Sequence, residues 1–541
     1  MTGSQIFIQG LINEGVDRVF GYAGATICSL MDEMMKVEDT IRYTLVRQEQ
    51  NAGHMASGYA RVTGKTGVCM VTSGPGATNL ITGIATAYMD SIPMVAVTGQ
   101  VPTNLIGRDI FQEVDILGAV TPFIKHSYLV KDARELPNII KEAFYIASTG
   151  RPGPVLIDFP QNIQDQEVKD PVFPDTVHIR GYNPSIKGNG RQLTHVIHAI
   201  SEAKKPVICA GGGVFLAHAE AELKSFAHEM NIPVVTTMMG LSLLDTDNPL
   251  NMGMIGKFGN RSANKAMVKA DLLIMIGMRV ADRAIMEPNE VKRRLTTIHI
   301  DVDSAEIGKN MEANIPLVGD AGIILNKLSE QCTAPDTTEW RAFLKDYRAE
   351  ELGRDFPEHP YVSPQRFMRK LGHHLEEGTA VCVDVGQNQI WACQHLYMHG
   401  IRFLTSGGLG TMGYGLPCGI GVKIAQPERN TVVINGDGSF QMSMNELAVV
   451  RANKLDLKII IIRNHVLGLV HQSQVRAPFH GAYGVDLEGD PDFEALIASY
   501  GIPSTVLEDD DKTDEALEAF LNSEGPQVLI VNVDPMCSTT E

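Results

Sequence analysis

Residues 434–464 read INGDGSFQMSMNELAVVRANKLDLKIIIIRN and contain the pattern that decides the fold. Two β-branched runs, 431–434 and 457–462, flank a stretch with helical spacing of apolar residues. A strand, a crossover helix and a second strand form a unit whose strands lie parallel in one sheet. The segment therefore predicts an α/β fold with a mostly parallel sheet.

Two polar residues follow these strands directly. Asp437 comes after the first strand and Asn464 ends the second, 27 residues later. Because ligand sites of open parallel sheets lie beyond the carboxyl ends of the strands, we expect the two side chains to converge. A carboxylate and an amide oxygen suit Mg²⁺, which completes its shell with phosphate oxygens and water. The alternative is a simple Gly-Asp-Gly turn with Asn464 as a helix cap.

The residues beside Asp437 favour a diphosphate at the same place. Gly436 and Gly438 let backbone N–H groups approach an anion closely. We expect Ser439 to open the crossover helix, whose positive end attracts phosphate. The segment thus predicts a cradle for a metal ion and a diphosphate.

Further strand-like runs extend the pattern over the whole chain. They lie at residues 67–72, 94–98, 154–159, 206–210, 271–276, 297–302, 380–385 and 527–533. A polar stretch at 164–190 and a charged segment at 329–359 divide the series. We therefore expect three α/β domains, at residues 1–165, 190–330 and 361–541, of which the first and third can share a fold.

Composition narrows the class of protein. The 541 residues are 44% hydrophobic and 20% charged, as in ordinary globular proteins. The net charge of −18 argues against binding to nucleic-acid backbones. Eight cysteines without a Cys-x-x-Cys pair fit reduced thiols, and no apolar stretch is long enough to cross a bilayer. We expect a cytoplasmic protein with neither nucleic-acid nor membrane partners.

Gly-Asp-Gly followed after about thirty residues by Asn resembles the signature of thiamine diphosphate enzymes. That family usually ends the motif with Asn-Asn, where this chain has Arg463-Asn464. The resemblance implies that Asp437, Asn464 and the carbonyl of Val466 bind Mg²⁺. It also implies thiamine diphosphate-binding folds for the first and third domains and a Rossmann-like middle domain.

The chain resembles the acetolactate synthase family nearly end to end. Glu49, in LVRQEQNAGHMASGYARVTGKTG, falls at the glutamate that hydrogen-bonds the cofactor's aminopyrimidine ring. A carboxyl group sharing a proton with that ring promotes the tautomer that activates the thiazolium carbon. Phe111 and Gln112 resemble residues that face the reacting carbon. Without the resemblance, a surface ion pair for Glu49 and loop packing for the other two are the ordinary interpretations.

The stretch TSGGLGTMGYGLP, residues 405–417, resembles the loop that supports the bent cofactor. Met412 would be the wedge beneath it and the Gly410 carbonyl would lie near its amino group, although a methionine can also fill a core. Further thiamine diphosphate contacts are implied at Gly386, Gln387, Asn388, Gly436, Gly438, Ser439, Gly468 and Leu469. The family commonly has histidine where Asn388 stands.

The middle domain resembles the family's FAD-binding domain. The flavin-contacting positions are Arg151, Gly211, Gly212, Thr237, Gly256, Gly277, Arg279, Arg283, Asp301 and Asp320. The resemblance implies a bound FAD without a redox role. Lys257-Phe258 replaces the usual Met-His, and Ala281 replaces an aspartate. Related carboligases keep this domain without flavin, which is the alternative.

Gly408, Gly410 and Gly413 also match the dinucleotide fingerprint G-x-G-x-x-G. An NAD-dependent oxidoreductase is therefore the rival from another class of enzyme. It leaves Asn464 and the whole first domain unexplained, and it places Asp437 between glycines instead of beside a ribose.

Several positions near the reacting centre depart from the family. Ala25 replaces a glycine, Gln161 replaces a lysine at the site entrance, and Ser473 replaces a tryptophan that shapes the choice of acceptor. The family's C-terminal arm has no counterpart after residue 535, so we expect weaker exclusion of water. The loss of the tryptophan predicts a reduced preference for 2-oxobutanoate over pyruvate as acceptor.

The resemblance implies a carboligase of branched-chain amino acid biosynthesis. It would decarboxylate pyruvate on thiamine diphosphate and transfer the two-carbon unit to a second 2-oxo acid. A homodimer or homotetramer and a small regulatory subunit are the implied partners, besides the small 2-oxo acid substrates. Two alternatives stay open: a sibling decarboxylase or carboligase for another 2-oxo acid, and a non-catalytic paralogue.

Overall fold

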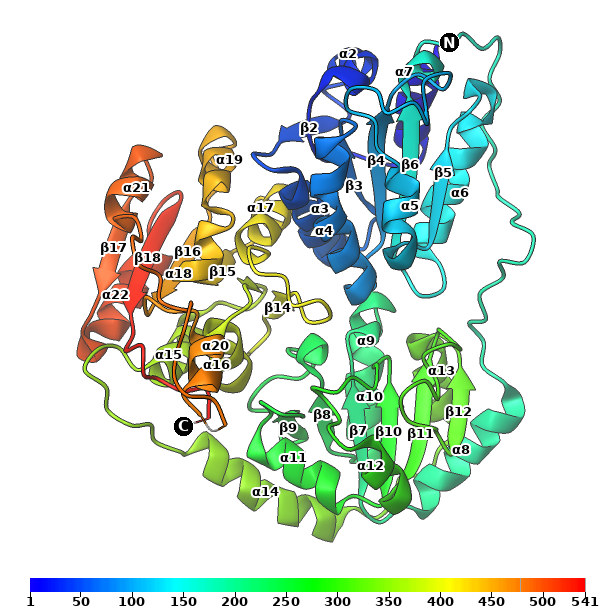
Figure 1. Ribbon diagram of the computed structural model, residues 1–541. Helices are drawn as coiled ribbons and strands as arrows, with labels where there is room; N and C mark the ends of the chain where they lie inside the picture. Colours follow the sequence, from blue (N-terminus) through cyan, green and yellow to red (C-terminus); the bar gives the residue numbers. More distant parts are fainter. Residues whose placement is uncertain (477, 541) are drawn as a thin grey trace.

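The computed structural model describes residues 1–476 and 478–540. Within these residues, three six-stranded sheets, all parallel, are each flanked by helices. Figure 1 shows the N-terminal domain in blue to cyan, the middle domain in green and the C-terminal domain in yellow to red. The expected three-domain α/β architecture is confirmed, and each sheet lies inside one of the three expected ranges, whose ends stay predictions. The helices of the described residues include none that is long and apolar enough to cross a membrane.

The N-terminal sheet has the strand order β2-β1-β3-β4-β6-β5. Its strands are β1 (Arg18–Tyr22), β2 (Arg42–Leu45), β3 (Gly67–Val71), β4 (Met94–Gln100), β5 (His126–Leu129) and β6 (Pro154–Pro160). Its main helices are α1 (Gly3–Asn13), α2 (Cys28–Met35), α3 (Glu49–Thr63), α4 (Pro75–Asp90), α5 (Ile116–Val120), α6 (Leu136–Ser148) and α7 (Gln161–Gln164). The strands β3, β4 and β6 are wholly buried, which explains their continuous apolar sequence.

The middle sheet has the order β12-β11-β10-β7-β8-β9, the arrangement of dinucleotide-binding domains. Its strands are β7 (Pro206–Ala210), β8 (Val234–Thr236), β9 (Asn251–Met254), β10 (Leu272–Ile276), β11 (Thr296–Asp301) and β12 (Ile315–Val318). Its helices are α8 (Gly190–Glu202), α9 (Gly213–Leu216), α10 (Glu220–Met230), α11 (Arg261–Lys269), α12 (Pro288–Arg294) and α13 (Ala321–Gln331). The expected Rossmann-like topology is therefore present. The strand order reverses at β7 and β10, beyond which ligands of this fold bind.

The C-terminal sheet has the order β14-β13-β15-β16-β18-β17, which repeats the N-terminal topology strand for strand. Its strands are β13 (Ala380–Val383), β14 (Arg402–Thr405), β15 (Thr431–Gly436), β16 (Lys458–Arg463), β17 (Ser504–Leu507) and β18 (Gln527–Asn532). Its helices are α15 (Pro364–His374), α16 (Gln387–His395), α17 (Gly415–Ala425), α18 (Asp437–Gln441), α19 (Leu447–Ala452), α20 (Gly468–Gln474), α21 (Phe493–Ser499) and α22 (Thr513–Leu521). The expectation that the first and third domains share a fold is confirmed. The charged segment before this domain is the helix α14 (Thr338–Leu352).

The crossover between β15 and β16 differs from the expected single helix. It consists of α18, a 3-10 turn η5 (Met444–Glu446) and α19. The first helix begins at Asp437, so Ser439 does not open it. Ser439 is instead the third residue of this helix, and from there its hydroxyl accepts a hydrogen bond from the N–H of Gly436 at 3.0 Å.

The N- and C-terminal domains pack through α3 and α17, which Figure 1 shows side by side. Their buried apolar residues form one continuous core cluster across both domains. A Cβ on Gly58 would lie 2.2 Å from the carbonyl oxygen of Cys418, and one on Gly421 would lie 2.0 Å from that of Met55. The two helices therefore touch through their backbones, and the relative position of the domains depends on these two glycines.

Candidate active site

Asp437 and Asn464 meet at the carboxyl edge of the C-terminal sheet. One carboxylate oxygen of Asp437 accepts hydrogen bonds from the N–H of Asn464 at 3.0 Å and of His465 at 2.7 Å. The other accepts from the N–H of Gly438 at 2.9 Å. Burial raises the pKa of Asp437 to about 6, against the lowering effect of these backbone bonds. The structure therefore brings together the two side chains that the strand ends indicate.

The donor set at this edge fits a hard divalent cation. The amide oxygen of Asn464 accepts from the N–H of Val466 at 3.2 Å, and its amide nitrogen donates to Gln387 at 2.9 Å. A buried carboxylate and an oriented amide oxygen are the ligand types that Mg²⁺ prefers. The strand order reverses between β13 and β15, where such sheets bind ligands; Asp437 follows β15, and Asn464 follows the next strand, β16.

The other residues expected to contact the diphosphate surround the same edge. Gly386 caps the start of α16 after β13, and Gly468 and Leu469 open α20 after β16. Asn388 donates its amide hydrogens to the carbonyl oxygens of Asp384 at 2.8 Å and Ile434 at 3.4 Å, and so braces the backbone here.

Gly438 lies close to apolar side chains at this edge. A Cβ at Gly438 would come within 2.9 Å of Leu467 and 3.8 Å of the terminal methyl of Met412. Met412 therefore approaches the Gly-Asp-Gly turn from the loop before α17, and its role as a wedge stays a prediction. Gly410, in the same loop, has a positive φ of 74°, a conformation that glycine adopts readily.

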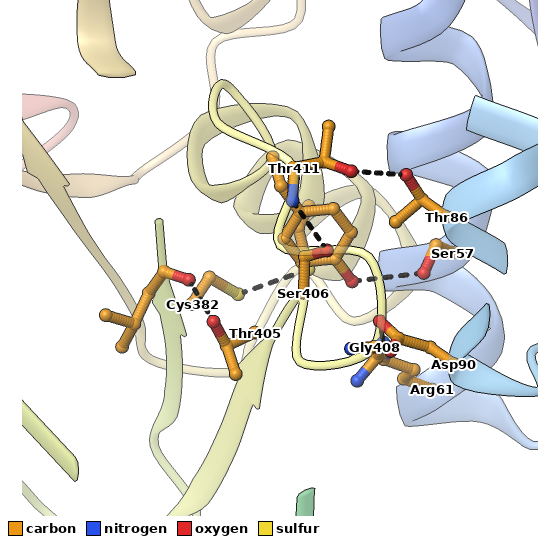
Figure 2. A network of polar contacts seen from close by, with 12 residues as sticks. Ser57, Arg61, Thr86, Asp90, Cys382, Thr405, Ser406, Gly408 and Thr411 are labelled. Carbon is orange, nitrogen blue, oxygen red and sulfur yellow. Dashed lines mark hydrogen bonds and ion pairs between the residues drawn. The ribbon is translucent and has the colours of Figure 1, made fainter. Parts of the chain in front are cut away.

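Loop 406–413 is held from both sides. Buried Asp384, at the end of β13, accepts from the N–H of Gly413 at 2.9 Å and of Gly415 at 2.7 Å. Figure 2 shows the other side, where residues of α3 and α4 face the loop. There the hydroxyls of Thr86 and Thr411 lie 2.8 Å apart.

Glu49, Phe111 and Gln112 lie in the N-terminal domain. Glu49 is the first residue of α3 and accepts a hydrogen bond from the side chain of Asn79 at 3.0 Å. Gln112 has a positive φ of 60° and packs on Gly74, where a Cβ would lie 2.9 Å from the Gln112 backbone. Phe111 is 86% exposed. The single chain thus presents these residues at the surface of their own domain.

A cavity of about 1070 Å³ lies between the three domains, just above the ~300–1,000 Å³ typical of ligand pockets. Eight of the ten positions expected to contact flavin line it: Arg151, Gly212, Thr237, Gly277, Arg279, Arg283, Asp301 and Asp320. Gly211 and Gly256 are not in the lining. A Cβ on either would meet a carbonyl oxygen, that of Gly277 at 2.3 Å or that of Arg283 at 2.0 Å, so both serve close packing. Gly410, Leu469 and Ser473 also line the cavity.

In the part of the chain that the structure describes, six basic and five acidic side chains line this cavity, and among the basic ones Arg279 and Arg402 are available to an anionic dinucleotide. Arg402 lies over the ring of Phe215 at 3.3 Å from its centroid and forms no salt bridge within the described residues. Burial, together with the nearby charge of Arg61, lowers the pKa of Arg402 to about 9. Burial also lowers the pKa of Arg279. Buried cations gain most from a bound anion, so the cavity fits a diphosphate-bearing ligand such as FAD.

Several residues of the site were not found from the sequence. Asp384 ends a strand as Asp437 does, so the same rule would have found it. Glu446 accepts from the N–H groups of Arg47 and Gln48 and thereby ties the start of α3 to the C-terminal domain. Gln472 is a further buried amide. A contact between positions almost 400 residues apart leaves no local pattern in one sequence.

Comparison with known proteins agrees with this geometry. Residues 1–119 match the family described as thiamine pyrophosphate enzyme, N-terminal TPP binding domain. Residues 193–328 match the central domain of such enzymes, and residues 384–531 match their C-terminal TPP binding domain.

Curated relatives cover nearly the whole chain. The acetolactate synthase of Arthrospira platensis is 41% identical over 551 residues, which is 98% of this chain and 94% of that protein. The acetolactate synthase large subunit of Haemophilus influenzae is 39% identical, covering 99% and 95%. That of Lactococcus lactis subsp. lactis is 38% identical, covering 94% and 88%.

Proposed function

Because the chain belongs to the acetolactate synthase family of thiamine pyrophosphate enzymes, we propose that it forms 2-acetolactate. As a thiamine diphosphate-dependent transferase, it would decarboxylate pyruvate and transfer the two-carbon unit to a second 2-oxo acid. The observation that carries this proposal is the meeting of Asp437 and Asn464 at the carboxyl ends of β15 and β16 in the C-terminal sheet.

Each part of that edge has a task in the proposed reaction. Asp437, Asn464 and the carbonyl of Val466 would hold Mg²⁺, and the N–H groups at Gly438 and the start of α20 would face the diphosphate. Thiamine diphosphate supplies a carbon acid and an electron sink when it is bound. The protein supplies orientation, fixed charges and exclusion of water.

Glu49 would hold a proton against the aminopyrimidine ring, and Gln112 would donate to a substrate oxygen. We propose that two copies of the chain complete each site, in a homodimer or a homotetramer. The exposure of Phe111 supports this, because a large aromatic ring at 86% exposure gains free energy when another surface covers it. A small regulatory subunit and a cytoplasmic location are further parts of the proposal.

FAD without a redox role is the proposed occupant of the 1070 Å³ cavity. Lys257, Phe258 and Ala281 line the cavity beside the residues that fit. Protein purified without added flavin should therefore show flavin absorbance in visible light. A colourless, fully active preparation would contradict this part of the proposal and leave acetolactate formation standing.

The decisive experiment incubates the protein with pyruvate, thiamine diphosphate and Mg²⁺ and measures CO₂ and acetolactate together. We expect equimolar release and formation, both abolished by a chelator and restored by Mg²⁺. Acetaldehyde as the main product would favour a sibling decarboxylase. Cofactor binding without CO₂ release would favour a non-catalytic paralogue. Asp437→Asn should lose both products, whereas Asp32→Asn, the same change at a 60% exposed aspartate, serves as a matched surface control.

A further inference from the structure

The C-terminal segment, residues 537–540, lies between the first turn of α16 and the last turn of α20. Figure 1 marks the C-terminus next to these two helices. Gln387, the first residue of α16, donates a hydrogen bond to the carbonyl oxygen of Cys537 at 2.9 Å. Gln472, in α20, donates to the hydroxyl of Thr539 at 2.9 Å and accepts from its N–H at 3.2 Å. All these groups are buried.

The segment also joins the two amides to each other and to Asn464. Gln387 donates to the amide oxygen of Gln472 at 2.9 Å. The oxygen of Gln387 then accepts from the amide nitrogen of Asn464 at 2.9 Å. The result is an unbroken relay from Thr539 and Cys537 through Gln472 and Gln387 to Asn464.

The relay has a fixed direction because its outer end is backbone. A carbonyl oxygen can only accept, so the amide nitrogen of Gln387 must point toward Cys537 and its oxygen must point away. That oxygen accepts from the amide nitrogen of Asn464. The oxygen of Asn464 is thereby left on the side away from Gln387, where it accepts from the N–H of Val466, whose carbonyl is the third expected ligand of the cation. A rotated Asn464 would present N–H groups to that cation and repel it.

Close packing holds the amides of Gln387 and Asn464 in this orientation. A Cβ at Gly468 would lie 1.9 Å from the amide oxygen of Gln387 and 2.9 Å from the amide nitrogen of Asn464. Only glycine permits α20 to start so near the two amides. The backbone of α20 therefore covers the relay and keeps water from competing for its hydrogen bonds.

We propose that residues 537–540 act as a strap that orients the metal-binding amide of Asn464 through Gln472 and Gln387. This inference rests on the proposed metal site. Gln472 and Thr539 are positioning residues in it, since neither lies among the expected ligands of Mg²⁺ or thiamine diphosphate. The strap thus makes metal affinity depend on a segment more than 70 residues further along the chain than Asn464.

The test measures Mn²⁺ binding by electron paramagnetic resonance, with thiamine diphosphate present, in full-length variants. Gln472→Leu removes both the oxygen that accepts from Gln387 and the nitrogen that donates to Thr539. It should weaken Mn²⁺ binding by roughly 10-fold or more, the usual effect of removing a group that orients a metal ligand. Thr539→Val, the milder change, should weaken it severalfold. The KM for pyruvate at saturating Mn²⁺ should stay within twofold, because the strap acts on the metal ligand.

Two variants separate orientation from simple damage. Gln472→Glu keeps an acceptor for Gln387 and for Thr539, and its added negative charge attracts a cation, so it should bind Mn²⁺ at least as tightly as the parent does. Gln474→Leu makes the same change in the same helix, where the amide bonds the backbone of Tyr483 outside the relay, and should also behave as the parent.

Two results would overturn the proposal in distinguishable ways. Parental Mn²⁺ affinity in both Gln472→Leu and Thr539→Val would overturn the strap alone. Failure of the parent protein itself to bind Mn²⁺ with thiamine diphosphate would overturn the proposed function, and the strap with it. Thermal unfolding of each variant shows whether it is folded, and Thr539→Val decides the matter if Gln472→Leu is not.

Discussion

The guanidinium of Arg61 donates to the carboxylate of Asp90 at 2.7 Å, with 5% and 0% of the two side chains exposed. The second oxygen of Asp90 accepts from the N–H of Gly408 at 2.7 Å. Figure 2 shows this pair reaching from α3 and α4 to the loop that carries Gly410 and Met412. One ion pair therefore fixes both the domain contact and the loop beneath the expected cofactor.

Removal of Asp90 should be costly because it leaves a buried guanidinium without a partner. We expect Asp90→Ala to destabilise the protein by about 3–5 kcal/mol, measured by urea unfolding. The double variant Arg61→Met with Asp90→Leu should recover most of that loss, since it leaves no buried charge. A loss below about 1 kcal/mol in Asp90→Ala would show that water reaches the pair.

Glu49→Gln should separate cofactor binding from activation of the cofactor. The amide oxygen of glutamine can still accept from Asn79, so α3 should start as before. The variant cannot hold the acidic proton, so we expect CO₂ release to fall by roughly 10²–10⁴-fold, the usual contribution of acid–base catalysis. Calorimetric titration should show thiamine diphosphate affinity within tenfold of the parent. Unchanged turnover would exclude a proton-holding role.

The sequence predicted ten of the eighteen strands in the described residues, those with continuous apolar runs, and the meeting of Asp437 and Asn464, because both depend on local rules. Strand ends of a parallel sheet meet at one edge whatever surrounds them. The break in the crossover after β15 was not predicted, since it depends on the buried Glu446 and its bonds to Arg47 and Gln48. A contact with another domain decides the local structure there.

The strap was not predicted from the sequence, for a related reason. The motif marked Gln387 as a diphosphate contact, yet its amide hydrogens go to Gln472 and Cys537. No spacing rule connects Thr539 with Gln472, because the segment after β18 follows no regular period. A familiar motif identifies the residues that contact a ligand. It does not identify the residues that hold those contacts in place.

Buried His54 should make the protein sensitive to acid. Its ring stacks edge-on against Tyr414, and neither ring nitrogen has a hydrogen-bond partner within the described residues. Burial lowers the pKa of His54 from 6.5 to about 3. Below pH 6.5 the unfolded chain binds a proton at this histidine that the folded chain does not bind until the pH nears 3. The free energy of unfolding therefore falls as the pH drops through this range, by about 2 kcal/mol at pH 5.

Substitution of this histidine should remove that part of the pH dependence. In His54→Phe, we expect the urea midpoint to fall less between pH 8 and pH 5 than in the parent. His198→Gln is the matched control, because the His198 side chain is 70% exposed and should change the pH dependence little. Equal acid sensitivity of His54→Phe and the parent would mean that His54 takes up a proton in the folded state.

Ser473 should set the choice of acceptor. It lies in α20 and lines the 1070 Å³ cavity. Its hydroxyl donates a hydrogen bond to the carbonyl oxygen of Leu469 at 2.8 Å. A small polar side chain therefore stands where the family has a large flat ring. An apolar pocket wall discriminates between two substrates that differ by one methylene by about 1–3 kcal/mol. Ser473→Trp supplies such a wall and should therefore raise the preference for 2-oxobutanoate over pyruvate by roughly 10-fold. The measurement is the product ratio when both acceptors compete. Ser473→Ala, which only removes the hydroxyl, should leave the ratio within twofold of the parent. A dominant four-carbon acceptor in the parent itself would show that another wall of the cavity selects the substrate.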